Sequence, residues 1–147
     1  TQLDRERGFV ACLKEKQLKL SHREVGNFIR HEAQDAAKRM FMTEDRPTAI
    51  FVANDHMAFG VMDILRSDIG LKIPQDVSVI GFDDVSLASY NAYDLTTIKQ
   101  PIAQMVDSTV NILLDQINYP EDKCNKVIKI DPYLVIRSST CKVKETK

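Results

Sequence analysis

Short apolar runs alternate along the chain with longer stretches in which apolar residues recur every three or four positions. Three of the runs read as strands covered on both faces: Thr48–Ala53, Val77–Phe82 and Leu95–Ile98. Helical periodicity predicts four helices: Arg5–Lys16, Glu32–Met42, Asn54 to about Asp68, and about Pro101 to Ile117. The alternation predicts an α/β fold with a mainly parallel sheet flanked by helices.

Other segments have weaker patterns. Arg23–Phe28 is preceded by a capping-box spacing but suits a short strand better, and we predict a strand there. Two last strands are expected on either side of Pro132, at Lys126–Ile130 and Tyr133–Ile136, followed by a charged, frayed tail at Lys142–Lys147. Gly60 lies inside a predicted helix, where it costs about 1 kcal/mol relative to alanine, so we expect close packing to require it.

The composition describes one ordinary domain without a strong overall charge. The chain has 147 residues, enough to bury a core, and its net charge of -1 argues against a general grip on nucleic acid or on anionic membranes. Three cysteines without paired short spacing disfavour both a disulfide framework and a zinc site. No stretch is apolar enough to cross a bilayer and there is no secretory signal, so we expect a cytoplasmic protein.

Polar pairs follow two of the predicted strands directly. Asn54 and Asp55 come after the first, and Asp83 and Asp84 come after the second. Parallel sheets bind ligands just outside the carboxyl ends of their strands, so these side chains are expected to face a common hollow. Asp55 is expected to cap the helix that follows, and Asp84 is more typical of a residue that organises its loop.

Several segments in this order resemble LacI/GalR-family transcriptional regulators. They are Pro47–Asp55, Ala58–Gly60, Ile73–Asp84, Leu95–Pro101 and Arg137–Thr140. The resemblance covers nearly the whole chain. It implies the carboxyl-terminal part of the periplasmic-binding-protein-like effector domain, which is a two-lobed sugar-binding clamp.

The resemblance also implies a domain organisation. Residues of about 1–96 and 122–140 form the second lobe, the helix of about 101–118 crosses into the first lobe, and residues 141–147 form a tail. We expect a DNA-binding headpiece and most of the first lobe to be missing before Thr1. A bare apolar stripe on the crossing helix is unfavourable in water, so we expect a second copy, repacking or exchange between chains to cover it, and a homodimer to form.

Three residues match the positions at which the family contacts its effector: Arg5, Asn54 and Asp83. An arginine fork can hold two hydroxyls or a carboxylate, an asparagine both donates and accepts, and an aspartate accepts from paired hydroxyls. The predicted partner is therefore a small effector, a sugar or a sugar phosphate, with DNA bound only through the missing headpiece. Two of these residues also have a simpler interpretation, as a surface charge for Arg5 and a helix cap for Asn54.

Two other classes of protein remain open. A transport-type sugar receptor has the same fold, and a receiver-type phosphoacceptor domain would use Asp83 and Asp84 together with Lys99. An enzyme is not expected, because the sequence has no nucleophile with its base, no glycine-rich phosphate loop and no cluster of metal ligands. We expect no cofactor.

Overall fold

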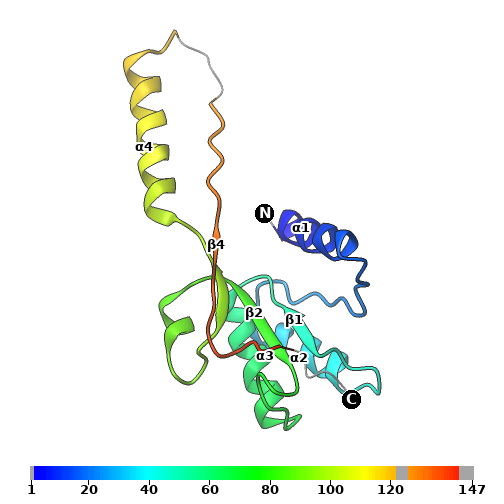
Figure 1. The fold of residues 1–147 in the computed structure, drawn as a ribbon. Helices are drawn as coiled ribbons and strands as arrows, with labels where there is room; N and C mark the ends of the chain where they lie inside the picture. Colours follow the sequence, from blue (N-terminus) through cyan, green and yellow to red (C-terminus); the bar gives the residue numbers. More distant parts are fainter. Residues whose placement is uncertain (1, 122–125, 143–147) are drawn as a thin grey trace.

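The computed structural model describes residues 2–121 and 126–142 (Figure 1). Its elements are α1 (Gln2–Glu15), α2 (Arg30–Phe41), β1 (Ala49–Phe51), α3 (Asp55–Ser67), β2 (Ser78–Asp83), the short 3-10 helix η1 (Ser86–Ser89), β3 (Thr96–Lys99), α4 (Ile102–Asn118) and β4 (Tyr133–Val135). The predicted α/β class and the mainly parallel sheet are confirmed.

The four strands lie in the order β1-β2-β3-β4. The first three are parallel, with Ile50 opposite Val79 and Gly81 opposite Thr97, and β4 is antiparallel to β3. Because β1, β2 and β3 run in the same direction, their carboxyl ends meet at one edge of the sheet. This edge carries the residues that follow each strand.

The two faces of the sheet are covered differently. Alternate residues of β2 point to opposite faces; Val79 is fully buried on the face covered by α2 and α3, which holds the main apolar core. The other face carries Phe51 and Phe82, and α1 lies over it: the Phe9 ring stacks on Phe51 with centroids 5.1 Å apart, and Arg5 lies over Phe82. Helix α1 is thus attached to the sheet by a few contacts beside the candidate site.

Gly60 in α3 is required by close packing, as expected. A Cβ atom at this position would lie 3.1 Å from the backbone oxygen of Arg30 and 2.8 Å from the Cγ atom of the same residue. At these distances, a Cβ atom on residue 60 would push the first turn of α2 away from α3. Glycine therefore sets how closely α2 and α3 approach each other.

Two predicted strands are wrong. Arg23–Phe28 has no strand conformation, because Asn27 and Phe28 both adopt positive φ, 48° and 59°, which ends any extended run. Lys126–Ile130 is also not a strand. It runs beside α4, where the Lys126 ammonium lies 2.7 Å from Asp115, and a helix offers no backbone groups for a strand to pair with. The tail prediction falls mostly on residues 143–147, outside the described part.

Helix α4 and the returning segment of residues 126–132 project away from the rest of the molecule (Figure 1). No residue of α4 is buried. Its apolar residues are between 42% and 72% exposed: Ile102, Met105, Val106, Val110, Leu113, Leu114 and Ile117. We call this set the α4 stripe. Across residues 2–121 and 126–142, no helix has both the length and the apolar character required to span a bilayer.

Candidate functional site

Arg5 connects the carboxyl ends of β1 and β2. Its Nη1 atom donates a hydrogen bond to the carbonyl oxygen of Ala53 at 2.6 Å, and its Nη2 atom lies 3.4 Å from Oδ1 of Asp83. The guanidinium also lies 3.9 Å from the centroid of the Phe82 ring, in a cation–π contact. The predicted surface-charge interpretation of Arg5 is therefore wrong, since its side chain is only 17% exposed.

Asp83 is the last residue of β2, and its side chain makes contacts through only one of its carboxylate oxygens in the described part of the chain. Its Oδ1 atom accepts a hydrogen bond of 2.7 Å from the side-chain amide of Gln100, in addition to the contact with Arg5. Within the described residues, no donor is bonded to its Oδ2 atom. The side chain is 25% exposed, so this second oxygen is available to accept from the hydroxyl of a ligand.

Asn54 lies one residue beyond the carbonyl that Arg5 binds, and it caps helix α3. Its backbone is extended, and its Oδ1 atom accepts a hydrogen bond of 2.9 Å from the backbone nitrogen of Met57. In the described part of the chain its Nδ2 atom has no acceptor. The cap interpretation is thus confirmed. Asn54 is only 9% exposed, and both N–H bonds of its amide group remain unused by the described residues.

Asp55 does not cap the helix, so the prediction for this residue is wrong. It is completely buried. Its Oδ1 atom accepts a hydrogen bond of 2.6 Å from the hydroxyl of Thr97, and its Oδ2 atom accepts one of 3.0 Å from the backbone nitrogen of Val85. Burial raises the pKa of Asp55, although these hydrogen bonds act in the opposite direction.

Asp84 organises its loop, as predicted. Arg137 donates a hydrogen bond of 2.6 Å to one of its carboxylate oxygens, and the Lys99 ammonium lies 3.0 Å from the other. Burial acts to raise the pKa of Asp84, but the hydrogen bonds from Arg137 and Lys99 outweigh it and the net shift is downward. The carboxylate is fully engaged within the protein and has no role left for a ligand.

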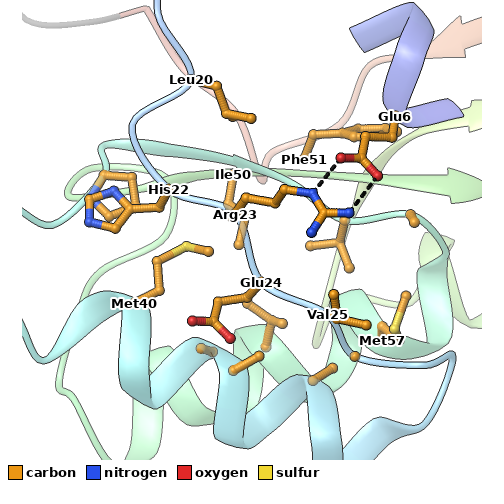
Figure 2. Close-up of a pocket in the computed structure, with 18 of the residues that line it drawn as sticks. Glu6, Leu20, His22, Arg23, Glu24, Val25, Met40, Ile50, Phe51 and Met57 are labelled. Atoms are coloured by element: carbon orange, nitrogen blue, oxygen red, sulfur yellow. Dashed lines mark hydrogen bonds and ion pairs between the residues drawn. The ribbon is translucent and has the colours of Figure 1, made fainter. Parts of the chain in front are cut away.

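A cavity of about 190 Å³ lies elsewhere, between α1, the segment of residues 20–26, α2 and β1 (Figure 2). Its wall is mostly apolar and includes Phe9, Met40 and Met57. Among the residues that line it, Arg23 pairs with Glu6, which is the ion pair drawn with dashed lines in Figure 2. Arg5, Asn54 and Asp83 do not line this cavity. The common hollow expected for Asn54 and Asp83 is therefore not this cavity.

The structure brings Arg5 and Asp83 together and places Asn54 beside the backbone group that Arg5 binds. Sequence reasoning did not assign Gln100 to this site, although it lies in one of the family-like segments directly after β3. A long amide side chain at the end of a third parallel strand is a signal that could have found it, because all three strands end at one edge.

Comparisons with known proteins show the family of the chain. The model of the periplasmic binding protein-like domain matches residues 1–140. The HTH-type transcriptional repressor PurR of Vibrio vulnificus (strain CMCP6) is 40% identical over 143 residues, which are 95% of this chain and 42% of the relative. PurR of Mannheimia succiniciproducens is 34% identical over 145 residues. The chain therefore spans less than half the length of these curated relatives.

Solved structures give the same result. A LacI family transcriptional regulator from Enterococcus faecium with bound ribose has a TM-score of 0.85 and 28% identity, over 97% of this chain and 53% of that one. The lac repressor dimer bound to operator and the anti-inducer ONPF has a TM-score of 0.83 and 30% identity, over 94% of this chain and 47% of that one. The chain belongs to the periplasmic binding protein-like domain family, and its relatives are LacI-family transcriptional repressors.

Proposed function

We propose that this chain is the effector-binding part of a LacI-type transcriptional regulator. The observation that carries the proposal is the polar cluster at the ends of β1, β2 and β3, where Arg5, Asp83 and Gln100 meet. It is joined by Asn54, whose amide nitrogen has no partner among the described residues. The cluster offers N–H donors and a free carboxylate oxygen on one edge, which is the pattern that vicinal hydroxyls of a sugar satisfy.

The proposed ligand is a small carbohydrate, a sugar or a sugar phosphate. Ribose is bound in the related regulators of Enterococcus faecium and of Enterococcus faecalis V583, the second being 33% identical to this chain. Partly buried polar groups reward a matching hydroxyl pattern, because leaving one of them unpaired costs about 1 to 3 kcal/mol. Arg5, Asn54 and Asp83 are the residues that we propose as ligand contacts.

The domain organisation proposed for the whole protein places residues of about 1–96 and 122–140 in the second lobe and the helix of about 101–118 against the first. The exposure of the α4 stripe supports this proposal, since a stripe of this size is expected to have a cover. A DNA-binding headpiece and most of the first lobe would then lie in a preceding part of a longer protein. The whole protein would act as a homodimer in the cytoplasm, and as a binding protein without catalytic activity.

The mechanism would be a shift in lobe closure. A sugar bound between the lobes favours one arrangement only to the extent that it binds that arrangement more tightly. The shift would change how paired headpieces lie on DNA. The family match favours this clamp over the receiver-type alternative, and the repressor relatives favour a regulator over a transport receptor.

Sugar titrations on the full-length protein test the proposal. Sugars and sugar phosphates are screened by thermal shift, and affinities are measured by calorimetry for Asp83→Asn, Arg5→Lys and Asn54→Asp. The last variant keeps the oxygen that caps α3 and loses only the amide donors. Each variant is expected to lose about fivefold to a hundredfold in affinity, the loss that follows from leaving one polar group unpaired.

The matched control is Arg7→Ala, on the same helix but with a side chain that is 76% exposed. It is expected to bind the sugar as the wild type does. If no sugar or sugar phosphate shifts the melting temperature, or if the three site variants bind as well as Arg7→Ala, the assignment of this cluster as the effector site is wrong.

A further inference from the structure

Asp55 stands out among the charged residues that the structure describes, because it alone is completely removed from solvent. A buried carboxylate is costly unless it is hydrogen-bonded, so its presence calls for a reason. Capping of α3 does not supply one, since Asn54 is the cap. Contact with a ligand does not supply one either, because no part of Asp55 is accessible.

The hydrogen bonds of Asp55 join three elements. The residue begins α3, accepts from the hydroxyl of Thr97 in β3, and accepts from the backbone of Val85 in the loop after β2. Its carboxylate lies directly against β2 at Gly81, where an added Cβ atom would come within 2.2 Å of Oδ1. The position of Asp55 is therefore fixed by β2 and β3, and Asp55 in turn holds the backbone that follows β2.

The loop that Asp55 holds has an unusual backbone. Asp83 has a φ angle of 122° and Asp84 one of 56°, both in the region that residues other than glycine rarely adopt. Such residues cost about 1 to 3 kcal/mol each and persist only where their surroundings hold them. The bond from Asp55 to Val85 lies immediately after these two residues, and Arg137 and Lys99 hold the Asp84 side chain.

The direction of the Asp83 side chain follows from this backbone. With φ at 122°, its carboxylate reaches Gln100 and Arg5 and leaves one oxygen free. If the loop relaxed to the ordinary negative φ region, the carboxylate would turn away from both partners.

We propose that Asp55 is a positioning residue for the effector site. By accepting a hydrogen bond from the backbone of Val85, it fixes the conformation of the loop and thereby the direction of the Asp83 side chain. The role of Asp83 as a ligand contact rests on the proposed function. The effect of Asp55 on the direction of the Asp83 side chain is a property of the protein without ligand. The two can therefore be tested separately.

The test without ligand uses the side-chain amide of Gln100 as a reporter, in a proton–nitrogen correlation spectrum of the full-length protein. Asp83→Ala shows the signal of this amide without its carboxylate partner. In Asp55→Ala, which removes both carboxylate oxygens, the signal is expected to move towards that position, and the Val85 amide to exchange with solvent at least about tenfold faster, as loss of one hydrogen bond to a charged group implies. Asp35→Ala, the same change at an exposed position, is the control and is expected to match the wild type.

If a folded Asp55→Ala protein keeps the wild-type Gln100 signal and Val85 exchange, the proposal is overturned. Should Asp55→Ala fail to fold, Thr97→Val replaces it, since that change removes the hydroxyl that holds the Asp55 carboxylate. Thr97→Val is expected to move the Gln100 signal in the same direction, and Thr97→Ser, which keeps the hydroxyl, to restore it. An unmoved signal in Thr97→Val also overturns the proposal.

A ligand arm links this result to the proposed function. If Asp55 acts on sugar binding only through Asp83, its substitution should weaken binding in the wild-type background and have no further effect in an Asp83→Ala background. Equal losses in both backgrounds would show a general structural effect and contradict the proposal. If no sugar binds, the proposed function fails, while the Gln100 reporter still decides the role of Asp55.

Discussion

The Arg137 guanidinium donates a hydrogen bond of 2.6 Å to the carboxylate of Asp84, which joins the loop after β2 to the last described stretch of the chain. Both side chains are largely buried, with 7% of Asp84 and 16% of Arg137 exposed. Arg137 also donates to the backbone oxygen of Leu95 at the start of β3. The segment after β4 thus holds the loop after β2 at Asp84, and Asp55 holds the same loop at Val85.

Removal of Arg137 is expected to destabilise the protein strongly. In Arg137→Gln the Asp84 carboxylate remains buried with only Lys99 beside it, and breaking a buried pair in this way costs about 3 kcal/mol or more. The free energy of unfolding, measured by urea denaturation, is expected to fall by about this amount.

Lys99→Gln is the control for this measurement. Lys99 binds the same carboxylate, but its side chain is 45% exposed, so the loss is expected to stay below about 1 kcal/mol. Equal losses for the two variants would mean that burial does not determine how much the Asp84–Arg137 pair contributes to the free energy of unfolding.

Stability is expected to fall in acid partly because of Asp84. The net downward shift of its pKa in the folded protein means that the unfolded chain binds a proton more readily. Its contribution is fully present above the ordinary pKa of an aspartate and is lost as the pH falls through that value towards the folded one. Asp84→Asn is expected to be less stable at neutral pH and to lose less stability on acidification. Urea midpoints over this pH range measure the effect, and an unchanged slope would contradict it.

Gly81 is expected to tolerate no side chain. In Gly81→Ala the added methyl would lie 2.2 Å from Oδ1 of Asp55 and 2.8 Å from a methyl group of Leu95. Moving a buried carboxylate away from Thr97 would cost at least about 2 kcal/mol, as overpacking and a lost charged hydrogen bond do together. Thermal unfolding measures the loss.

Gly8→Ala is the matched control for this substitution. Gly8 lies inside α1, and an added Cβ atom there would meet nothing within 4 Å. The same change is therefore expected to stabilise the protein by up to about 1 kcal/mol through helix propensity. A loss of stability comparable to that of Gly81→Ala would mean that the space around a glycine does not determine the effect of adding a methyl group there.

The order and type of most elements could be predicted from the sequence because periodicity reports directly on burial. The helix at Asp55–Ser67 and the strand at Ser78–Asp83 have strong patterns, and both predictions are confirmed. The predicted strand at Arg23–Phe28 is wrong because two residues at its end, Asn27 and Phe28, adopt the left-handed conformation. Asparagine is enriched in that conformation, but phenylalanine rarely adopts it.

The candidate site was only partly predictable for a different reason. That Asn54 and Asp83 follow parallel strands can be read from the sequence, because parallel strands end at one edge. Whether a particular carboxylate faces solvent, as Asp83 does, or is buried against glycine, as Asp55 is, depends on loop geometry. Asp55 and Asp83 have similar neighbours in the sequence. Only their hydrogen bonds in the folded structure show that their roles differ.

The α4 stripe is expected to make the chain of residues 1–147 self-associate. Its members are at least 42% exposed along one side of a 17-residue helix, and such a surface is unfavourable in water. Sedimentation at increasing concentration is expected to show dimers or larger species. Leu113→Glu, which places a charge in the middle of the stripe, is expected to shift the chain to monomers. Asn111→Glu adds the same charge at an exposed polar position of α4 and should leave the association unchanged.

The same substitution is expected to act differently in a longer protein that contains the first lobe. If that lobe covers the stripe, Leu113→Glu buries an unpaired carboxylate and lowers the free energy of unfolding by at least about 3 kcal/mol. In the shorter chain the side chain is 52% exposed, and the effect on stability should stay within about 0.5 kcal/mol. Urea denaturation of both proteins gives the comparison. Equal small effects would show that the first lobe leaves the stripe bare, and the proposed crossover of α4 into that lobe would be wrong.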